Sequence, residues 1–359
     1  MGSEEPTFSA LRGRLQGGLC GLAAAALFGA STPLLKLLVP ETGAVMLAGL
    51  LYVGAAAGVW VYERGLRAMG HARHEAPLRR ADLFPALGVV LCGGVAGPIL
   101  MLIGLERVSG VVGSLLLNLE AAFTMILAIV VFHEHLSRRE ALAAAVIVAG
   151  AALLGYRPGE VHADTWGIVA LGGACLAWAI DNNLSQRLSL RDPLAIVKLK
   201  GLGAGACALG IGWLTGQRLP EPAPMMAALA LGAVSYGASL GLDMQALRLL
   251  GAAREAAFFA TAPFIGALLA LPVLGERAAA VDVASACFLA LGVGTLLSAR
   301  HDHLHAHDAI EHEHVHEHDE HHRHHDEPTA PAHSHAHVHE RFSHDHAHVS
   351  DVHHRHSHH

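Results

Sequence analysis

The sequence predicts an all-α integral membrane protein, with ten transmembrane helices arranged as two inverted five-helix repeats and a disordered C-terminal tail. Apolar runs of about twenty residues recur through residues 17–299, and runs of this length match the hydrocarbon thickness of a bilayer. Aromatic residues make up only 5% of the chain, which suits membrane helices that pack through small side chains. The tail, residues 300–359, has no such run and carries 24 of the 29 histidines.

Polar breaks divide the membrane body into its candidate helices. The basic residues of the N-terminal segment 1–16 stand before a long apolar run without a clear cleavage site, so we expect a first membrane helix and no removed signal peptide. Residues 17–156 then form the first repeat and 166–299 the second. The ten helices are expected near residues 17–38, 42–62, 83–105, 111–132, 139–156, 166–188, 193–214, 225–247, 255–274 and 280–299.

The basic residues orient the predicted helices in the membrane, because cytoplasmic loops carry an excess of Lys and Arg. With a cytoplasmic N-terminus, the inner side holds fourteen basic residues: Arg12, Arg14, Arg64, Arg67, Arg73, Arg79, Arg80, Arg138, Arg139, Arg187, Arg191, Arg248, Arg254 and Arg300. The outer side then holds five: Lys36, Arg107, Arg157, Arg218 and Arg277. We therefore expect a multi-pass protein of the inner (plasma) membrane with both termini, and so the tail, in the cytoplasm.

An internal repeat links the two halves of the body. Leu105–Ser137 aligns with Leu247–Ala279 at an offset of 142, which places Glu134 on Glu276. A second alignment, at an offset of 150, places Phe28 on Trp178, and the order of the matches is the same in both halves. Each half has an odd number of spans, so the second copy enters the membrane from the opposite side. Inverted repeats of this kind are typical of secondary transporters.

Three stretches resemble a known family. They are residues 26–36 (Ala-Leu-Phe-Gly-Ala-Ser-Thr-Pro-Leu-Leu-Lys), 176–179 (Leu-Ala-Trp-Ala) and 274–277 (Leu-Gly-Glu-Arg). Through them, over about residues 9–299, the chain resembles the ten-helix EamA branch of the drug/metabolite transporter (DMT) superfamily. His133 and His135 depart from the family pattern around Glu134. The resemblance implies a gradient-driven carrier of small organic solutes, often an exporter, and the chain has no G-x-x-x-x-G-K-[ST] phosphate loop.

Ionisable side chains within the spans are candidates for the solute pathway, because they are costly in a bilayer. Asp181 lies about seven residues from the cytoplasmic end of its span, or roughly 10 Å deep at 1.5 Å per residue. Lys198 and Lys200 lie at a similar depth in the next span, so a pair with Asp181 is possible. Being two residues apart, the lysines cannot share a helix face. Such a pair either stabilises the bundle or binds an anionic or zwitterionic solute group, and Asn182 extends the polar cluster.

Glu120 is about ten residues from either end of its span and therefore near the midplane. It could carry a coupling proton, or it could be hydrogen-bonded to a neighbouring helix without ever titrating. Each remaining pathway candidate could instead have a structural role: packing, hydrogen bonding between helices, or anchoring at the membrane interface. They are Lys36 in the first span, Asn118 in the fourth, Trp178 in the sixth, and Tyr236 and Asp243 in the eighth.

The tail is expected to bind zinc, nickel, cobalt or copper, because neutral imidazole is a preferred ligand of such metals. It lacks an apolar core and should be disordered without metal. It could buffer or store metal, gate the carrier, hand metal to the pore, or bind metal incidentally. The candidate ligands alternate with other residues: His301, His303, His305, His307, His312, His314, His316, His318, His333, His335, His337 and His339.

These observations favour a secondary carrier of a small organic solute whose tail buffers or senses metal. Two alternatives stay open: a divalent-metal or metal-chelate exporter, and a membrane-anchored metal sink or sensor that transports nothing. The five histidines outside the tail (His71, His74, His133, His135 and His162) stand in predicted loops, which argues against metal as the transported species. We expect no enzymatic activity and no required cofactor. The expected partners are lipid, a small solute and divalent metal, without nucleic acid; the solute, direction, coupling ion and oligomeric state stay open.

Overall fold

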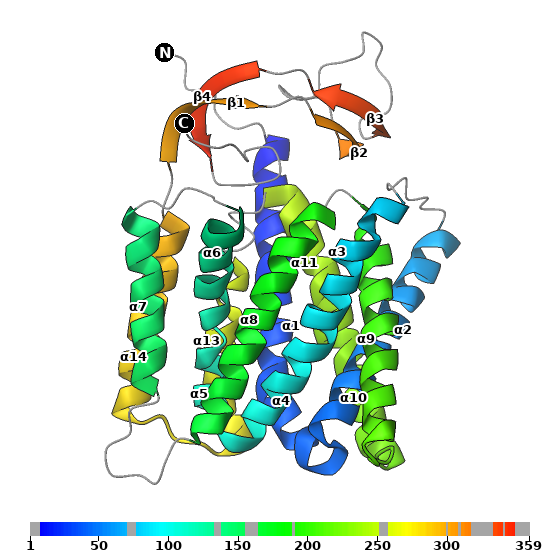
Figure 1. The fold of residues 1–359 in the computed structure, drawn as a ribbon, viewed down its shortest axis with the longest axis vertical. Helices are drawn as coiled ribbons and strands as arrows, with labels where there is room; N and C mark the ends of the chain where they lie inside the picture. Colours follow the sequence, from blue (N-terminus) through cyan, green and yellow to red (C-terminus); the bar gives the residue numbers. More distant parts are fainter. Residues whose placement is uncertain are drawn as a thin grey trace.

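The computed structural model describes residues 8–69, 77–132, 138–154, 164–188, 191–250, 258–298, 301–307, 310–316, 333–339 and 342–348. Its body is a bundle of helices, and its tail contains short strands (Figure 1). Within the described residues, seven helices are long and apolar enough to cross a membrane, and three shorter apolar helices accompany them. Together these match the ten predicted segments, so the prediction of a helical membrane protein is confirmed.

The first repeat contains five crossings, of which the third and fourth consist of several pieces. They are α1 (Phe8–Thr42); α2 (Ala44–Ala68); η1 (Arg80–Asp82), α3 (Leu83–Gly88), η2 (Val89–Ala96) and α4 (Gly97–Arg107); α5 (Gly110–Leu116) and α6 (Leu119–Phe132); and α7 (Arg138–Leu154). The second repeat contains α8 (Thr165–Leu188); α9 (Pro193–Leu214); α10 (Pro222–Leu231), η3 (Gly232–Ala238) and α11 (Ser239–Leu250); α13 (Ala262–Leu274); and α14 (Ala280–Ser298).

The third crossing of each repeat is interrupted by a π-helical stretch, η2 in the first and η3 in the second. When Val89–Ala96 is shifted by the 142-residue offset of the sequence repeat, it falls on residues 231–238. The stretch η3 begins one residue later, at Gly232, and ends at the same residue, Ala238. Because a π-helix bonds each N–H to the carbonyl five residues earlier, such stretches redirect backbone groups and often occur at functional sites. The internal symmetry of the sequence thus extends to an irregular backbone feature.

The two repeats interlock in space (Figure 1). The opening helix of the first repeat, α1, packs on α11 and α13 of the second repeat. The opening helix of the second repeat, α8, packs in the same way on α4 and α6 of the first. The second crossings α2 and α9 contact each other, as do the last crossings α7 and α14. This pattern of contacts is what a two-fold axis between the repeats would produce.

Glycines let the second crossing of the first repeat approach the third crossing of the second very closely. A Cβ atom added to Gly54 of α2 would lie 2.2 Å from the Leu229 carbonyl oxygen of α10. One added to Gly232 would lie 2.1 Å from the Leu51 carbonyl oxygen. Small residues of this kind allow close helix packing in a membrane, where burial of large apolar side chains drives association less than it does in water.

In the tail, the structure describes strands β1 (His301–His307), β2 (Ile310–His316), β3 (His333–His339) and β4 (Phe342–His348). β1 pairs with β4 and β2 with β3, both antiparallel. Histidine alternates with other residues along each of these segments, and an alternation of two is the period of a strand. The strands lie beyond the end of the bundle at which α14 ends (Figure 1).

Candidate functional site

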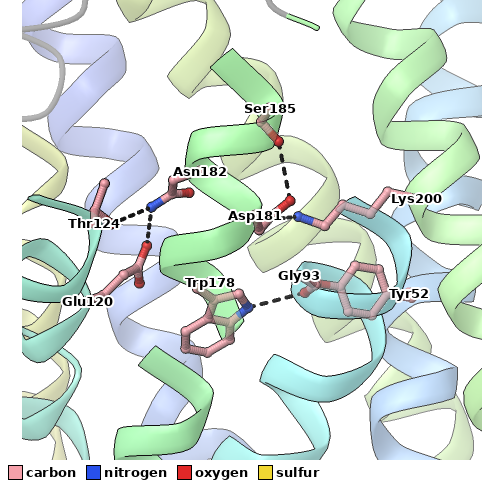
Figure 2. A network of polar contacts seen from close by, with 9 residues as sticks. All are labelled: Tyr52, Gly93, Glu120, Thr124, Trp178, Asp181, Asn182, Ser185 and Lys200. Carbon is pink, nitrogen blue, oxygen red and sulfur yellow. Dashed lines mark hydrogen bonds and ion pairs between the residues drawn. The ribbon is translucent and has the colours of Figure 1, made fainter. Parts of the chain in front are cut away.

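A network of polar contacts surrounds the stretch of α8 from Trp178 to Ser185 (Figure 2). Asp181 stands between these two residues at helical spacings of three and four, so all three lie on one face of α8. That face meets η2 and α9, while the neighbouring residue Asn182 meets α6. The site therefore combines side chains from both repeats.

Asp181 and Lys200 form a buried ion pair with 2.5 Å between Oδ2 and Nζ. Only 5% of Asp181 is exposed, and its Oδ1 accepts a hydrogen bond from the Ser185 hydroxyl at 3.2 Å. Lys198 instead pairs with Glu63 of α2 at 2.6 Å. The two lysines point to different partners because residues two apart lie on different helix faces.

Glu120 lies on the other side of α8, one residue into α6. Its Oε1 accepts a hydrogen bond from Asn182 Nδ2 at 2.7 Å, and the Thr124 hydroxyl is 3.5 Å from the same nitrogen. With Glu120 and Asp181 ionised, the cluster of Glu120, Asp181 and Lys200 carries one surplus negative charge. It therefore offers both an ammonium group and two carboxylates to a ligand.

The carbonyl of Gly93, in the π-helical stretch η2, accepts two hydrogen bonds from aromatic side chains. They come from the Tyr52 hydroxyl at 2.8 Å and from Trp178 Nε1 at 3.1 Å. A Cβ atom at Gly93 would stand 2.1 Å from Asp181 Oδ2. A glycine is therefore required here for Asp181 to reach its position between η2 and α9.

An aromatic cluster adjoins this network through Tyr52. The ring of Tyr236, in η3, lies 5.6 Å from the rings of both Tyr52 and Phe28, measured between centroids. Phe28 in turn lies 5.4 Å from Phe259. Tyr236 is only 4% exposed, and its hydroxyl has no hydrogen-bond partner among the described residues. A buried hydroxyl in this situation has unused capacity to bind a ligand or a water molecule.

The break between α5 and α6 has its own hydrogen-bond partners. Asn118 Nδ2 donates to the Leu115 carbonyl at 3.0 Å. The thiol of Cys175 on α8 lies 3.6 Å from the Leu116 carbonyl and 3.8 Å from the Leu117 carbonyl. Helix breaks at membrane depth need such partners because lipid offers none. Asn118, which lies in the break, therefore has a structural partner in the last turn of α5.

At the end of the bundle away from the tail, two charged side chains hold the turn between α4 and α5. Lys36 of α1 donates to the Leu105 carbonyl at 2.6 Å and to the Val108 carbonyl. The carboxylate of Glu276, just after α13, accepts from the backbone N–H groups of Gly110 and Val111 at 2.6 and 2.9 Å. We call Lys36, Glu276 and this turn the α4–α5 latch.

The structure thus brings together five of the predicted pathway residues: Glu120, Trp178, Asp181, Asn182 and Lys200. Tyr236 joins through its ring contact with Tyr52. The other four lie elsewhere: Lys36 in the latch, Asn118 at the helix break, Lys198 with Glu63, and Asp243 seven residues beyond Tyr236 on α11.

Of the predicted tail ligands, eleven lie in strands β1, β2 and β3, and His318 lies outside the described residues. His133, Glu134 and His135 lie outside them as well. Among the described side chains, no group of three or more His, Cys, Asp or Glu residues is placed to hold a metal ion.

Sequence reasoning missed Tyr52, Gly93, Thr124 and Ser185, which complete the network. The signal for Gly93 was a Gly-Gly pair inside an otherwise apolar span, and the signal for Tyr52 was a phenol near the middle of its span. Thr124 and Ser185 follow Glu120 and Asp181 by four residues, which is the spacing of neighbours on one helix face.

Comparisons with known proteins agree with the two-repeat architecture. The model of the EamA-like transporter family matches the chain twice, over residues 15–156 and 165–298. An uncharacterized transporter of Methanothermobacter thermautotrophicus is 28% identical over 304 residues, which cover 80% of this chain and 88% of that protein. A protein of known crystal structure, 16% identical, superposes with a TM-score of 0.58 over 79% of this chain and 98% of its own. That last similarity concerns the fold alone.

Proposed function

Because the chain belongs to the EamA-like transporter family, we propose that it is a gradient-driven secondary transporter that exports a small organic solute without ATP. The observation that carries this proposal is the network around α8, where Glu120, Asp181 and Lys200 come together from helices of both repeats. Transporters built from inverted repeats bind their solutes near the midplane between the repeats. Ionisable residues at membrane depth are costly and usually serve such a pathway.

The charges suggest the chemical class of the solute. Lys200 would bind a carboxylate or another anionic group, and Glu120 or Asp181 would bind an amine, so an anionic or zwitterionic solute fits. The apolar part of the solute would lie against Trp178 and Tyr236. In the absence of solute, the Asp181–Lys200 pair compensates both charges, and a bound ionic group would exchange for one partner.

Transport would proceed by alternating access. The α4–α5 latch closes the end of the bundle away from the tail, because Lys36 and Glu276 tie the turn of the first repeat to α1 and α13. Opening toward that side would break these hydrogen bonds and allow the interlocked pairs α1 with α13 and α8 with α6 to rock against each other. Glu120 would carry the coupling proton in the same cycle.

The experiment that tests this proposal uses everted membrane vesicles from cells that produce the full chain. The vesicles receive a small-molecule extract of the same cells and an imposed proton gradient, and the solutes taken up are identified by mass spectrometry. We expect at least one anionic or zwitterionic solute to accumulate with the native chain and with Lys198→Met, but not with Lys200→Met. Equal uptake by all three, or uptake no greater than in vesicles without the chain, would contradict the proposal.

For the tail, we propose that it lies in the cytoplasm of a cell with this protein in its inner membrane, and that it buffers or senses zinc, nickel, cobalt or copper. Fourteen basic residues on the inner side against five on the outer side support this orientation. The 24 histidines of the tail support metal binding.

A further inference from the structure

Tyr236 carries a buried hydroxyl that the described protein does not pair. The residue is 4% exposed, and its hydroxyl has no hydrogen-bond partner among the described residues. A hydroxyl that gives up its hydrogen bonds to water without replacing them costs free energy. A phenylalanine would make the same ring contacts without that cost. The hydroxyl is therefore explained by a partner that binds from outside the protein.

The position of Tyr236 is the contact between the two repeats. Tyr52 of α2 donates its hydroxyl to the Gly93 carbonyl in η2 at 2.8 Å, while its ring lies 5.6 Å from the ring of Tyr236 in η3. Tyr52 thus connects the π-helical stretch of the first repeat with that of the second. Transporters built from inverted repeats bind their solutes between the repeats, so Tyr236 stands where a solute is expected.

The charged groups lie at the other end of this series of contacts. Gly93 adjoins the Asp181 carboxylate, which pairs with Lys200, and its carbonyl also accepts from Trp178 (Figure 2). From Lys200 toward Tyr236, ionic groups therefore give way to aromatic rings, and the unpaired hydroxyl follows. A solute with its ionic group at Lys200 and its apolar part along the rings would present its far end to Tyr236.

We propose that Tyr236 is a specificity-determining residue, whose hydroxyl forms a hydrogen bond with a second polar group on the apolar part of the solute. This inference rests on the proposed transport of an ionic solute and narrows the solute class to ions that carry such a group, a hydroxyl or a carbonyl. A phenol both donates and accepts, so it suits either. An analogue without the second group is disfavoured, because it leaves the Tyr236 hydroxyl unpaired.

Tyr52 is the matched control for Tyr236. Both phenols are 4% exposed and their rings are in contact, but only the Tyr52 hydroxyl has an acceptor among the described residues. Replacement by phenylalanine removes one oxygen atom from each. Tyr52→Phe should lower the unfolding temperature, because the Gly93 carbonyl loses one of its two donors. Tyr236→Phe should leave the unfolding temperature unchanged or raise it slightly, since it removes an unpaired group.

The test compares everted membrane vesicles that contain the native full chain, Tyr236→Phe or Tyr52→Phe. All receive the same small-molecule extract and an imposed proton gradient, and uptake per amount of protein is measured for each solute by mass spectrometry. Thermal unfolding of the three proteins is measured in detergent.

We expect Tyr236→Phe to lower the uptake of ionic solutes with a second polar group about two- to tenfold, the usual range for one hydrogen bond. Uptake of ionic solutes with a wholly apolar remainder should not fall. Tyr52→Phe should reduce the uptake of both kinds alike, because it disturbs Gly93 and, through it, Asp181.

Three results would overturn the role of Tyr236 while leaving the proposed transport intact. They are equal uptake of every solute by Tyr236→Phe and the native chain, accumulation only of solutes without a second polar group, and a Tyr236→Phe protein as unstable as Tyr52→Phe. The last result would assign the hydroxyl a structural partner. No uptake by the native chain above that of vesicles without it would overturn the transport proposal, and this inference with it.

Discussion

Asp181 has separate partners for its two carboxylate oxygens, Lys200 for Oδ2 and Ser185 for Oδ1. Since a buried carboxylate is tolerated only when its charge is compensated, Asp181 and Lys200 depend on each other. Lys198, two residues away, has Glu63 as its partner and is more exposed. The two lysines therefore form a matched pair for experiments, alike in sequence context and different in burial.

Lys200→Met should lower the free energy of unfolding by about 3–5 kcal/mol, because it leaves the charge of Asp181 buried and unpaired. The double variant Asp181→Asn/Lys200→Met should recover part of this loss but no transport. Lys198→Met should cost about 1 kcal/mol or less, as is usual for more exposed ion pairs. Thermal unfolding in detergent and vesicle uptake measure both quantities. Additive losses in the double variant would show that the two residues are not coupled.

Gly93→Ala should disturb the site without changing any charge. The added methyl group would stand 2.1 Å from Asp181 Oδ2, and overpacking of this kind costs about 1–3 kcal/mol. Gly172→Ala on α8 is the control, since a Cβ there meets nothing within 4 Å. We expect reduced uptake and a lower unfolding temperature for Gly93→Ala and native behaviour for Gly172→Ala. Equal behaviour of the two variants would mean that Asp181 has room to move.

Individual charged residues were the part of the site most open to prediction. A carboxylate and two lysines at equal depth on consecutive spans made an ion pair geometrically possible, and Asp181 does pair with Lys200. The role of Gly93 was not predictable in the same way. Its carbonyl accepts two side-chain hydrogen bonds, and its lack of a Cβ makes room for Asp181, neither of which hydropathy or charge reports.

The α4–α5 latch holds the turn between α4 and α5 against α1 and α13. Glu276 accepts from the first two N–H groups of α5, so Glu276→Ala removes two charge-assisted hydrogen bonds from that helix start. Each such bond contributes about 1.5–3 kcal/mol, so the loss should be visible in thermal unfolding. Arg277→Ala, at the exposed neighbouring position, is the control. An Arg277→Ala variant as unstable as Glu276→Ala would assign the effect to the loop rather than to the latch.

Breaks and π-helical stretches within the crossings could not be predicted from the sequence. The fourth crossing was predicted as one helix over 111–132, but it breaks between α5 and α6. The third and eighth crossings contain π-helical stretches. A π-helical turn contains one more residue than an α-helical turn. Hydropathy is averaged over a window of residues, so it does not change when one turn contains an extra residue. The repeat offset could have shown that an irregularity in one half recurs in the other, but not that it exists.

Removal of the tail should separate metal handling from solute transport. Cells that produce the full chain should retain more zinc or nickel than cells that produce a version ending at Arg300, and both versions should export the solute equally. Elemental analysis of the cells, beside the vesicle assay, measures the two effects. If the shortened chain still alters metal accumulation, metal passes through the helix bundle and the exporter of organic solutes is the wrong proposal.

The orientation in the membrane can be tested independently. A cysteine introduced at Pro158, in the predicted outer loop after the fifth span, should react with a membrane-impermeant maleimide in intact cells. A cysteine at Thr329 in the tail should react only after the cells are opened. The native chain, with its five cysteines, provides the background. The reverse pattern would place the tail outside the cell.

Ten apolar segments and their order were predictable because membrane thickness limits the length of a span. The packing of these segments against one another was harder to predict from the sequence. The sequence suggested two repeats, yet α1 lies against α11 and α13 of the second and α8 against α4 and α6 of the first. This exchange, in which the opening helix of each repeat packs against helices of the other repeat, depends on helix surfaces of small residues. Those surfaces differ little in composition from the surfaces that face lipid.

This exchange has a consequence for synthesis of the protein. The hydroxyl of Ser239 on α11 donates to the carbonyl of Ala24 on α1, across a separation of 215 residues. At typical translation rates that stretch takes on the order of tens of seconds to emerge. During this time α1 lies in the membrane before α11 and α13, its neighbours in the folded protein, have been synthesised. A ribosome that stalls between the repeats would therefore leave an unfinished product with an unmatched helix at each end, a natural substrate for membrane proteases.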